Sequence, residues 1–169
     1  MRALFFALLG CTGLGPDGTD VAVETCNGQP GLCERPLNEV TFLRTHNSHA
    51  SEERGYTVLS WNHYFAIPAQ LADGVRSLNV DVYPAEDGGL RACHGFCELG
   101  EQPLEDLFDE IEAFMESHPR EVVLLDFQDE SAEGALRDAL ATHPLSGRAW
   151  VQVAGTPWPT LQEMIEADE

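Results

Sequence analysis

Residues 74–83 read Gly-Val-Arg-Ser-Leu-Asn-Val-Asp-Val-Tyr, and this stretch is the clearest indication of the fold. From residue 77 onward, apolar Leu and Val alternate with Ser, Asn and Asp. Strict alternation is the period of a β-strand, in which successive side chains point to opposite faces of a sheet. The stretch therefore predicts a strand over residues 77–83 that carries a carboxylate, Asp81.

A histidine ends a predicted strand on either side of this stretch. His46 lies in Arg-Thr-His-Asn-Ser at 44–48, and His94 lies in Arg-Ala-Cys-His-Gly at 91–95. An unperturbed histidine titrates near neutral pH, so one member of a pair can accept a proton while the other donates one. Together with Asp81 they supply a general base, a general acid and a charge anchor. Acid–base cleavage of a phosphodiester needs this set of groups.

Strand and helix patterns alternate along the rest of the chain, which indicates an α/β fold with a largely parallel sheet. The nearly continuous apolar run at 122–127 is typical of a strand buried on both faces. Thr160 and Glu163 form a capping-box pattern that predicts a last helix. We predict strands over residues 39–43, 77–83, 90–93, 122–127 and 150–153, and helices over residues 67–73, 103–118, 131–142 and from 160 onward.

The length of the chain limits the architecture. An eightfold barrel typically needs about 250 residues, whereas this chain has 169 and shows about five strands. It holds little more than half of such a barrel. No repeat or second domain is visible, so we predict one domain over residues 25–169.

The chain is strongly acidic, with 29 Asp and Glu residues against nine Lys and Arg and a net charge of −20. This balance excludes nucleic acid as a partner, because nucleic-acid binding is largely cationic neutralisation of phosphates. It also disfavours simple electrostatic attachment to anionic lipid. An anionic substrate requires a cation or a local arginine cluster to offset the repulsion.

The first eleven residues resemble a short signal peptide with a bacterial lipobox, Leu-Leu-Gly-Cys at 8–11. Cleavage there would leave Cys11 as a lipidated first residue and give membrane contact through a lipid anchor. The apolar run is far too short to span a bilayer. The alternative is a wrongly assigned start codon with part of the signal missing. Residues 12–24 are predicted to be a flexible tether, and the whole pattern predicts an exported protein.

Four further cysteines form two close pairs, Cys26 with Cys33 and Cys93 with Cys97. Four cysteines allow three connectivities, and we favour a disulfide within each pair. The competing interpretation is a zinc site, but the sequence contains no Cys-x-x-Cys.

Four motifs in a fixed order resemble one protein family. They are Thr-His-Asn-Ser at 45–48, Gln-Leu-Ala-Asp-Gly-Val-Arg and Asp-Val-Tyr between 70 and 83, Cys-His-Gly-Phe-Cys at 93–97, and Pro-Arg-Glu-Val-Val-Leu-Leu-Asp-Phe at 119–127. The set resembles the X region of phosphatidylinositol-specific phospholipase C, and more closely the exported PLC-like phosphodiesterases of bacteria and fungi, over about residues 38–166. The resemblance implies a TIM-type (β/α) barrel, here only its N-terminal half to two-thirds, with the site at the C-terminal ends of the strands.

The resemblance also implies roles for individual residues. His46 matches the general base that activates the attacking hydroxyl, and His94 matches the acid that protonates the leaving alcohol. Asn47 and Asp81 match positions that hold calcium in the metal-dependent members.

The chain departs from the calcium-dependent pattern at two positions. Asn79 stands where those members have Glu, and Gln128 aligns with another such Glu. Calcium prefers several oxygen ligands with carboxylates among them, so the two amides should weaken a calcium site. The metal-free bacterial members have Arg where this chain has Asp81. Arg76 and Arg44 are the nearby cations that can stabilise charge in the transition state.

Several of these residues also have a purely structural interpretation. His46 fits a hydrogen-bonded core histidine, His94 a cap on a disulfide loop, and Arg76 a buried structural arginine. Asp81 fits an ion pair with Arg76 or Arg91. Asp126 and Asp129 fit strand-end or helix-capping groups, and His49 and His63 fit surface or loop positions.

The sequence thus predicts a phosphoric diester hydrolase acting on a phospholipid or glycerophosphodiester. One alternative is a non-catalytic exported lipoprotein that binds a phosphorylated headgroup. Another is an inactive fragment of a longer enzyme.

Overall fold

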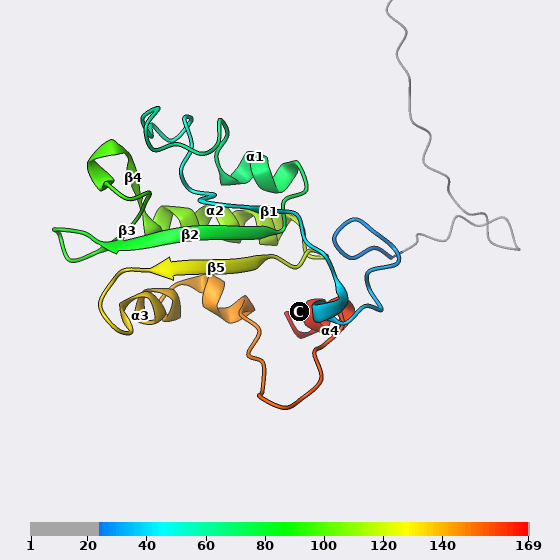
Figure 1. The fold of residues 1–169 in the computed structure, drawn as a ribbon. Helices are drawn as coiled ribbons and strands as arrows, with labels where there is room; N and C mark the ends of the chain where they lie inside the picture. Colours follow the sequence, from blue (N-terminus) through cyan, green and yellow to red (C-terminus); the bar gives the residue numbers. More distant parts are fainter. Residues whose placement is uncertain (1–23, 169) are drawn as a thin grey trace, which may run out of the picture.

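A computed structural model describes residues 24–168 of the chain. Its centre is β2 (Ser77–Pro84), which pairs along its whole length with other strands (Figure 1). β5 (Leu124–Asp129) runs parallel to residues 77–82 and occupies one edge. Because a strand has only two edges, β1 (Arg44–Thr45) and β3 (Leu90–Cys93) share the other, β1 parallel and β3 antiparallel.

β4 (Glu101–Pro103) extends the sheet antiparallel to β3. The five strands form an open sheet, and within residues 24–168 it does not close into a barrel. The remaining elements are the helices α1 (Ile67–Ala72), α2 (Leu104–Ser117), α3 (Ala135–Ala141) and α4 (Leu161–Ala167), and the 3₁₀ turns Leu37–Glu39, Cys97–Leu99 and Pro144–Arg148. None of the described helices is both long and apolar enough to cross a membrane.

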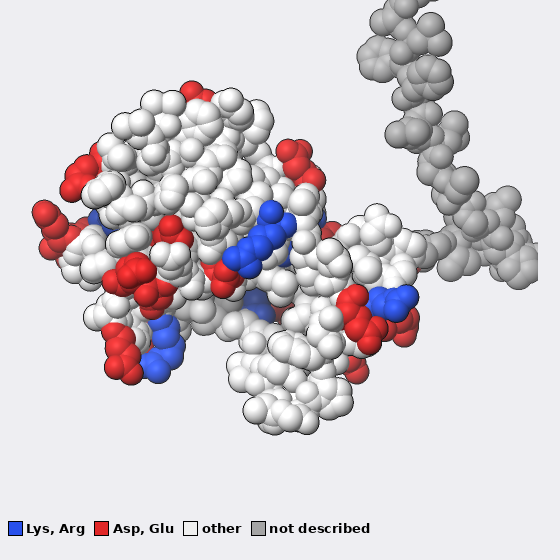
Figure 2. Space-filling model, in the orientation of Figure 1, with Lys and Arg blue, Asp and Glu red and all other residues white. Residues whose placement is uncertain are grey.

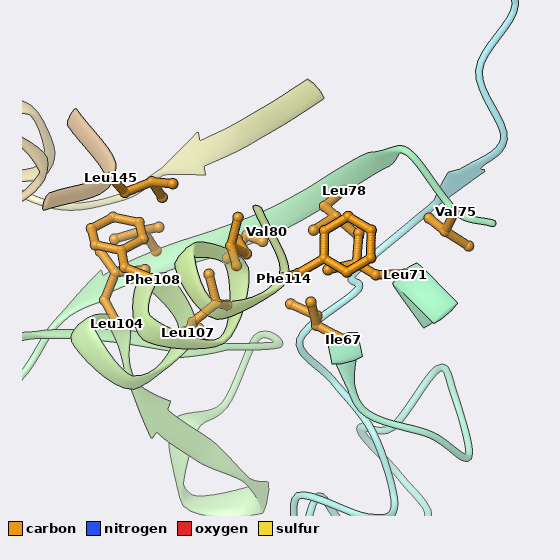
Figure 3. Packing of buried hydrophobic residues seen from close by; sticks show 13 residues of the cluster. Ile67, Leu71, Val75, Leu78, Val80, Leu104, Leu107, Phe108, Phe114 and Leu145 are labelled. Carbon is orange, nitrogen blue, oxygen red and sulfur yellow. The ribbon is translucent and has the colours of Figure 1, made fainter. Parts of the chain in front are cut away.

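The main core lies between β2 and the two helices α1 and α2. Leu78 and Val80 project from β2 against Leu107, Phe108 and their neighbours on α2 (Figure 3). All four side chains are at most 2% exposed, and burying each contributes about 1.5–3 kcal/mol. Alternation then turns the side chains of residues 77, 79 and 81 to the opposite face of β2, where the polar residues gather.

A second core joins the two ends of the described chain. The apolar face of α4 packs on the loop closed by the Cys26–Cys33 disulfide. A second disulfide joins Cys93 to Cys97. The predicted local pairing of the cysteines is therefore confirmed, as is the Thr160/Glu163 capping box at the start of α4.

The structure corrects several predicted strands. The strand predicted at 39–43 is only Arg44–Thr45, because these two residues alone reach the first residues of β2. The strand predicted at 150–153 is absent from the described structure, and Val151 and Val153 are exposed. An apolar pattern does not show whether a partner strand lies within reach, and an extended segment without one does not form a ladder.

The sheet is also mixed rather than largely parallel, because β3 and β4 form an antiparallel pair that the sequence did not indicate. The helix predicted at 131–142 begins only at Ala135, after Gly134 in a left-handed conformation. The predicted signal peptide and Cys11 lie outside the described residues, as does all but the last residue of the predicted tether.

His49 lies in the turn after β1, which agrees with the predicted loop position, but its side chain is buried and not at the surface. It is 1% exposed, and neither ring nitrogen has a hydrogen-bond partner. Its ring packs edge-on against Tyr56, whose hydroxyl donates to the carbonyl of Ala92. Burial lowers the pKa of His49 from 6.5 to about 4, so the ring is neutral in the folded protein at neutral pH.

This burial predicts acid sensitivity. The unfolded chain binds a proton at His49 below about pH 6.5 and the folded chain only below about pH 4, so stability present above pH 6.5 is lost as the pH falls through this window. The loss reaches about 3 kcal/mol in the free energy of unfolding. Between pH 7 and pH 4.5, the free energy of unfolding measured with urea should decrease less in His49→Leu than in the wild type, because the variant lacks the buried imidazole. His118→Leu, which removes an exposed histidine, should behave like the wild type. Equal decreases in all three proteins would contradict the assignment.

Candidate active site

The candidate site lies at the C-terminal ends of the parallel strands. His46 and Asn47 directly follow β1, and Asp81 lies in β2. His94 directly follows β3, next to Cys93, whose disulfide to Cys97 closes the loop. The strands thus bring together four of the residues singled out in the sequence.

The turn after β1 is fastened to a single residue of β2. Asn47 has a left-handed backbone (φ 50°) and donates its N–H to Oδ1 of Asn79 at 3.1 Å. The N–H of Ser48 donates to the Asn79 carbonyl at 2.8 Å, and the N–H of Asn79 donates to the Ser48 hydroxyl at 3.0 Å. Gln70 of α1 donates to the Ser48 carbonyl at 2.8 Å. These buried bonds fix the directions of His46 and Asn47.

Asn47 connects Asp81 to His94. Its amide fits its neighbours in one orientation, with the nitrogen donating to both Asp81 oxygens at 3.2 and 3.3 Å and the oxygen accepting from Nε2 of His94 at 3.0 Å. The other ring nitrogen of His94, Nδ1, donates to the carbonyl of Ser60 at 2.8 Å. The two contacts orient the ring of His94 at both of its nitrogens.

Asp81 is the carboxylate of this network, and it is only 5% exposed. Burial raises the pKa of Asp81, while the charges of His94 and then His46 act in the opposite direction. Both histidines are therefore close enough to Asp81 to influence its charge.

His46 itself is exposed, so its ring is accessible to a bound molecule. Its backbone is held in place by His63, whose Nε2 donates to the His46 carbonyl at 2.8 Å. His63, to which the sequence gave a surface or loop role, therefore supports the first candidate histidine. No sequence pattern marks this role, or that of the Ser60 carbonyl, because both are contacts of the backbone.

The two arginines occupy different places. Arg76 precedes β2, five residues and so roughly 16 Å along the strand from Asp81. It pairs with Glu121 at 2.6 Å and donates to two backbone carbonyls, in agreement with the structural interpretation. Arg44 lies nearer, at the start of β1, and pairs with Asp126. Neither arginine forms an ion pair with Asp81 in the described structure.

Asn79 and Gln128, the two amides at positions where the calcium-dependent members have Glu, differ in their surroundings. The side-chain oxygen of Asn79 accepts a hydrogen bond from the N–H of Asn47, and its side-chain nitrogen donates to Asp126 at 3.4 Å. Both polar atoms of this side chain are therefore used within the protein. Gln128 lies opposite Asp81 in the strand register, is exposed and donates to Glu130.

The donor set does not fit a resident calcium ion. Calcium takes six to eight oxygen ligands. Here the Asn47 amide contacts one carboxylate, that of Asp81, and its oxygen already accepts a hydrogen bond from His94, so it is not free to bind a cation. Across residues 24–168, no three His, Cys, Asp or Glu side chains group as metal ligands.

Comparisons with known proteins agree with this geometry. The chain is 29% identical over 153 residues to PI-PLC X domain-containing protein 1 of Arthroderma benhamiae, covering 83% of this chain and 47% of that protein. It is 26% identical over 146 residues to PI-PLC X domain-containing protein At5g67130 of Arabidopsis thaliana, covering 78% and 34%. The chain thus spans about half or less of the length of these relatives.

A solved structure shares the fold. It is the F249X mutant of phosphatidylinositol-specific phospholipase C from Staphylococcus aureus, with a TM-score of 0.57 and 16% sequence identity. The match covers 76% of this chain and 46% of that one. The open α/β sheet of this chain, with its helices, is therefore similar to part of that protein's fold. Residues 32–169 match the family model described as PI-PLC X 1, and the chain therefore belongs to the PI-PLC X domain family.

Proposed function

We propose that this chain carries the two catalytic histidines of a phosphoric diester hydrolase that acts on a phospholipid or glycerophosphodiester. Membership of the PI-PLC X domain family supports a PLC-like phosphodiesterase. The observation that carries the proposal is His94, whose two nitrogens donate to the Asn47 amide and the Ser60 carbonyl. A histidine oriented at both ring nitrogens near a buried carboxylate supports a role in proton transfer to a bound substrate.

In the proposed reaction, His46 takes the proton from a hydroxyl of the substrate, whose oxygen then forms a bond to phosphorus. As the bond from phosphorus to the leaving oxygen breaks, His94 gives that oxygen a proton. The first product is a cyclic phosphate, and His46 is left protonated and His94 neutral. Water can open the ring with the two roles reversed, which restores both histidines. Asp81 and Asn47 orient His94 through both steps.

We also propose that the protein is exported. The two disulfides support this proposal, because disulfides form and persist in oxidising compartments. An exported protein meets phospholipids at a membrane surface, in agreement with the proposed class of substrate.

Removal of either histidine tests the catalytic assignment. His46→Ala and His94→Ala should each lower turnover of phosphatidylinositol or its glycerophosphodiester by about 10²–10⁴-fold, the usual contribution of a general acid or base. His118→Ala, which removes a histidine at the far end of α2, is the matched control and should retain activity. Circular dichroism should show that all three remain folded. Wild-type turnover in either site variant would exclude the mechanism. A folded wild-type protein with no turnover would favour the headgroup-binding lipoprotein.

Removal of metal tests the interpretation of the donor set. Turnover should be unchanged by a chelator such as EGTA and by added calcium, because the Asn47 amide is hydrogen-bonded both to Asp81 and to His94. Loss of activity in the chelator that calcium restores would instead make these two residues metal ligands.

A further inference from the structure

The Cys93–Cys97 disulfide joins the strand that carries His94 to a neighbouring 3₁₀ turn. Cys93 is the last residue of β3, and His94 follows it directly. Cys97 begins the 3₁₀ turn, four residues further along the chain. Between the two cysteines, the N–H of Phe96 donates to the His94 carbonyl at 3.0 Å. The disulfide therefore closes a short loop that contains the candidate acid.

The 3₁₀ turn holds the residue that orients the ring of His94. The Leu99 carbonyl accepts from the Ser60 hydroxyl at 2.9 Å and from the N–H of Thr57 at 2.8 Å. The N–H of Ser60 donates to the Thr57 carbonyl at 2.9 Å. The Ser60 carbonyl then accepts from Nδ1 of His94 at 2.8 Å. These contacts form a closed circuit, which leaves the disulfide at its second cysteine and returns to it through the backbone of His94.

Gly100 fixes the far end of the 3₁₀ turn against the start of the same segment. A Cβ added at Gly100 would lie 2.6 Å from the Cα and Cγ atoms of Tyr56, too close for any side chain. Tyr56 is itself 3% exposed, and its hydroxyl donates to the Ala92 carbonyl at 2.6 Å. Because residues 97–100 pack so closely on residue 56, a movement of the 3₁₀ turn also moves the segment that carries Ser60.

One of the two cysteines is accessible to a reagent. Cys93 is fully buried, whereas Cys97 is partly exposed and lines a surface cavity of about 700 Å³. Four carboxylates and Arg91 line the same cavity. Acidic side chains gather in this region, over the β2–β3 turn and β4 at the left of Figure 2. A thiol therefore reaches the disulfide at Cys97, and an anionic thiol is repelled there.

We propose that the Cys93–Cys97 disulfide is a redox-controlled positioning element for His94, which makes the protein active in an oxidising compartment and impaired in a reducing one. The proposal rests on the proposed function, because it assigns the effect of the disulfide to proton transfer by His94. When the bond is broken, the circuit opens, and its hydrogen bonds alone no longer fix the Ser60 carbonyl relative to His94. A misplacement of about 1 Å can lower a rate about 10²-fold.

Reduction by a dithiol breaks this bond in two steps. One thiolate of the dithiol attacks Sγ of Cys97, the bond between the two sulfurs breaks, and Cys93 leaves as a thiolate that takes up a proton. The second thiolate of the reagent then displaces Cys97, which also takes up a proton. The dithiol ends as a cyclic disulfide, and the protein has gained two electrons and two protons.

The first test compares the oxidised full chain with the chain reduced by dithiothreitol, an uncharged dithiol. The substrate is the soluble glycerophosphodiester of phosphatidylinositol. Reduction should lower kcat about 10–100-fold, since a displaced acid protonates the leaving group poorly. KM should change little, and reoxidation should restore kcat. Mass spectrometry of alkylated peptides identifies the disulfide that has been reduced. An unchanged kcat in protein with Cys93 and Cys97 fully reduced would overturn the proposal.

Three variants separate this disulfide from the other one. Cys93→Ala/Cys97→Ala should have the low kcat of the reduced protein with or without dithiothreitol. Cys26→Ala/Cys33→Ala removes the disulfide of the second core and is the matched control. It should keep the wild-type kcat and the wild-type response to the dithiol. Gly100→Ala displaces the 3₁₀ turn with both disulfides intact and should lower kcat in the oxidised protein. The reverse pattern in the two double variants would contradict the assignment.

The second test follows His94 directly and does not require turnover. Imidazole ¹⁵N spectra of the oxidised protein should show a hydrogen-bonded Nδ1 of His94, identified by its absence in His94→Ala. Reduction should shift this signal to the averaged value of a freely rotating ring. The internal control is His143, whose Nδ1 accepts from the N–H of Leu145 at 3.1 Å, and its signal should stay unchanged.

The two tests separate the role of the disulfide from the proposed function. If the oxidised protein has no turnover but reduction still shifts the His94 signal, the proposed function is contradicted and the positioning by the disulfide stands. If the protein turns over substrate with the same kcat and the same His94 signal in both redox states, the positioning is overturned and the proposed function stands. A fall in kcat with an unchanged His94 signal would also overturn it.

Discussion

The hydrogen bonds that fasten residues 46–48 to β2 are the constraint on which the site depends. Asn79 accepts from Asn47 with its side chain, accepts from Ser48 with its carbonyl and donates to Ser48 with its N–H. Because one residue of the central strand makes all three bonds, the turn cannot move independently of the sheet. His46 is thereby directed outward and Asn47 inward, toward Asp81. Buried bonds of this kind are costly to break, since each leaves an unsatisfied polar group.

The same bonds explain why an amide suits position 79. A carboxylate only accepts hydrogen bonds, whereas the Asn79 amide accepts from Asn47 and also presents its nitrogen to Asp126. Asp126 in turn balances the charge of Arg44. An amide at position 79 therefore gives the turn a neutral support. The network from Asp81 through Asn47 to His94 can then hold a proton donor in place without a bound cation.

Much of this arrangement is predictable from local sequence, and the rest depends on contacts between distant segments. Alternation identified β2, and the order of motifs indicated His46, Asn47, Asp81 and His94. The segment at 150–153 has the composition of a strand but no partner within reach, and the short β4 carries no periodic signal. The burial of His49 and the contacts of His63 and Ser60 depend on how the loop after β1 folds back. That path is set by backbone hydrogen bonds, which every residue type can form.

The central claim is that Asp81 and Asn47 position His94 as the acid that protonates the leaving group. The most direct measurement compares two phosphodiesters that share a neighbouring hydroxyl and differ in having an alkyl or a nitrophenyl leaving group. A nitrophenolate leaves without a proton, so His94→Ala and Asn47→Asp should lose far more activity on the alkyl substrate than on the nitrophenyl one. His46→Ala should lose activity on both, because the nucleophile still needs a base. Equal losses on the two substrates in His94→Ala would contradict the account.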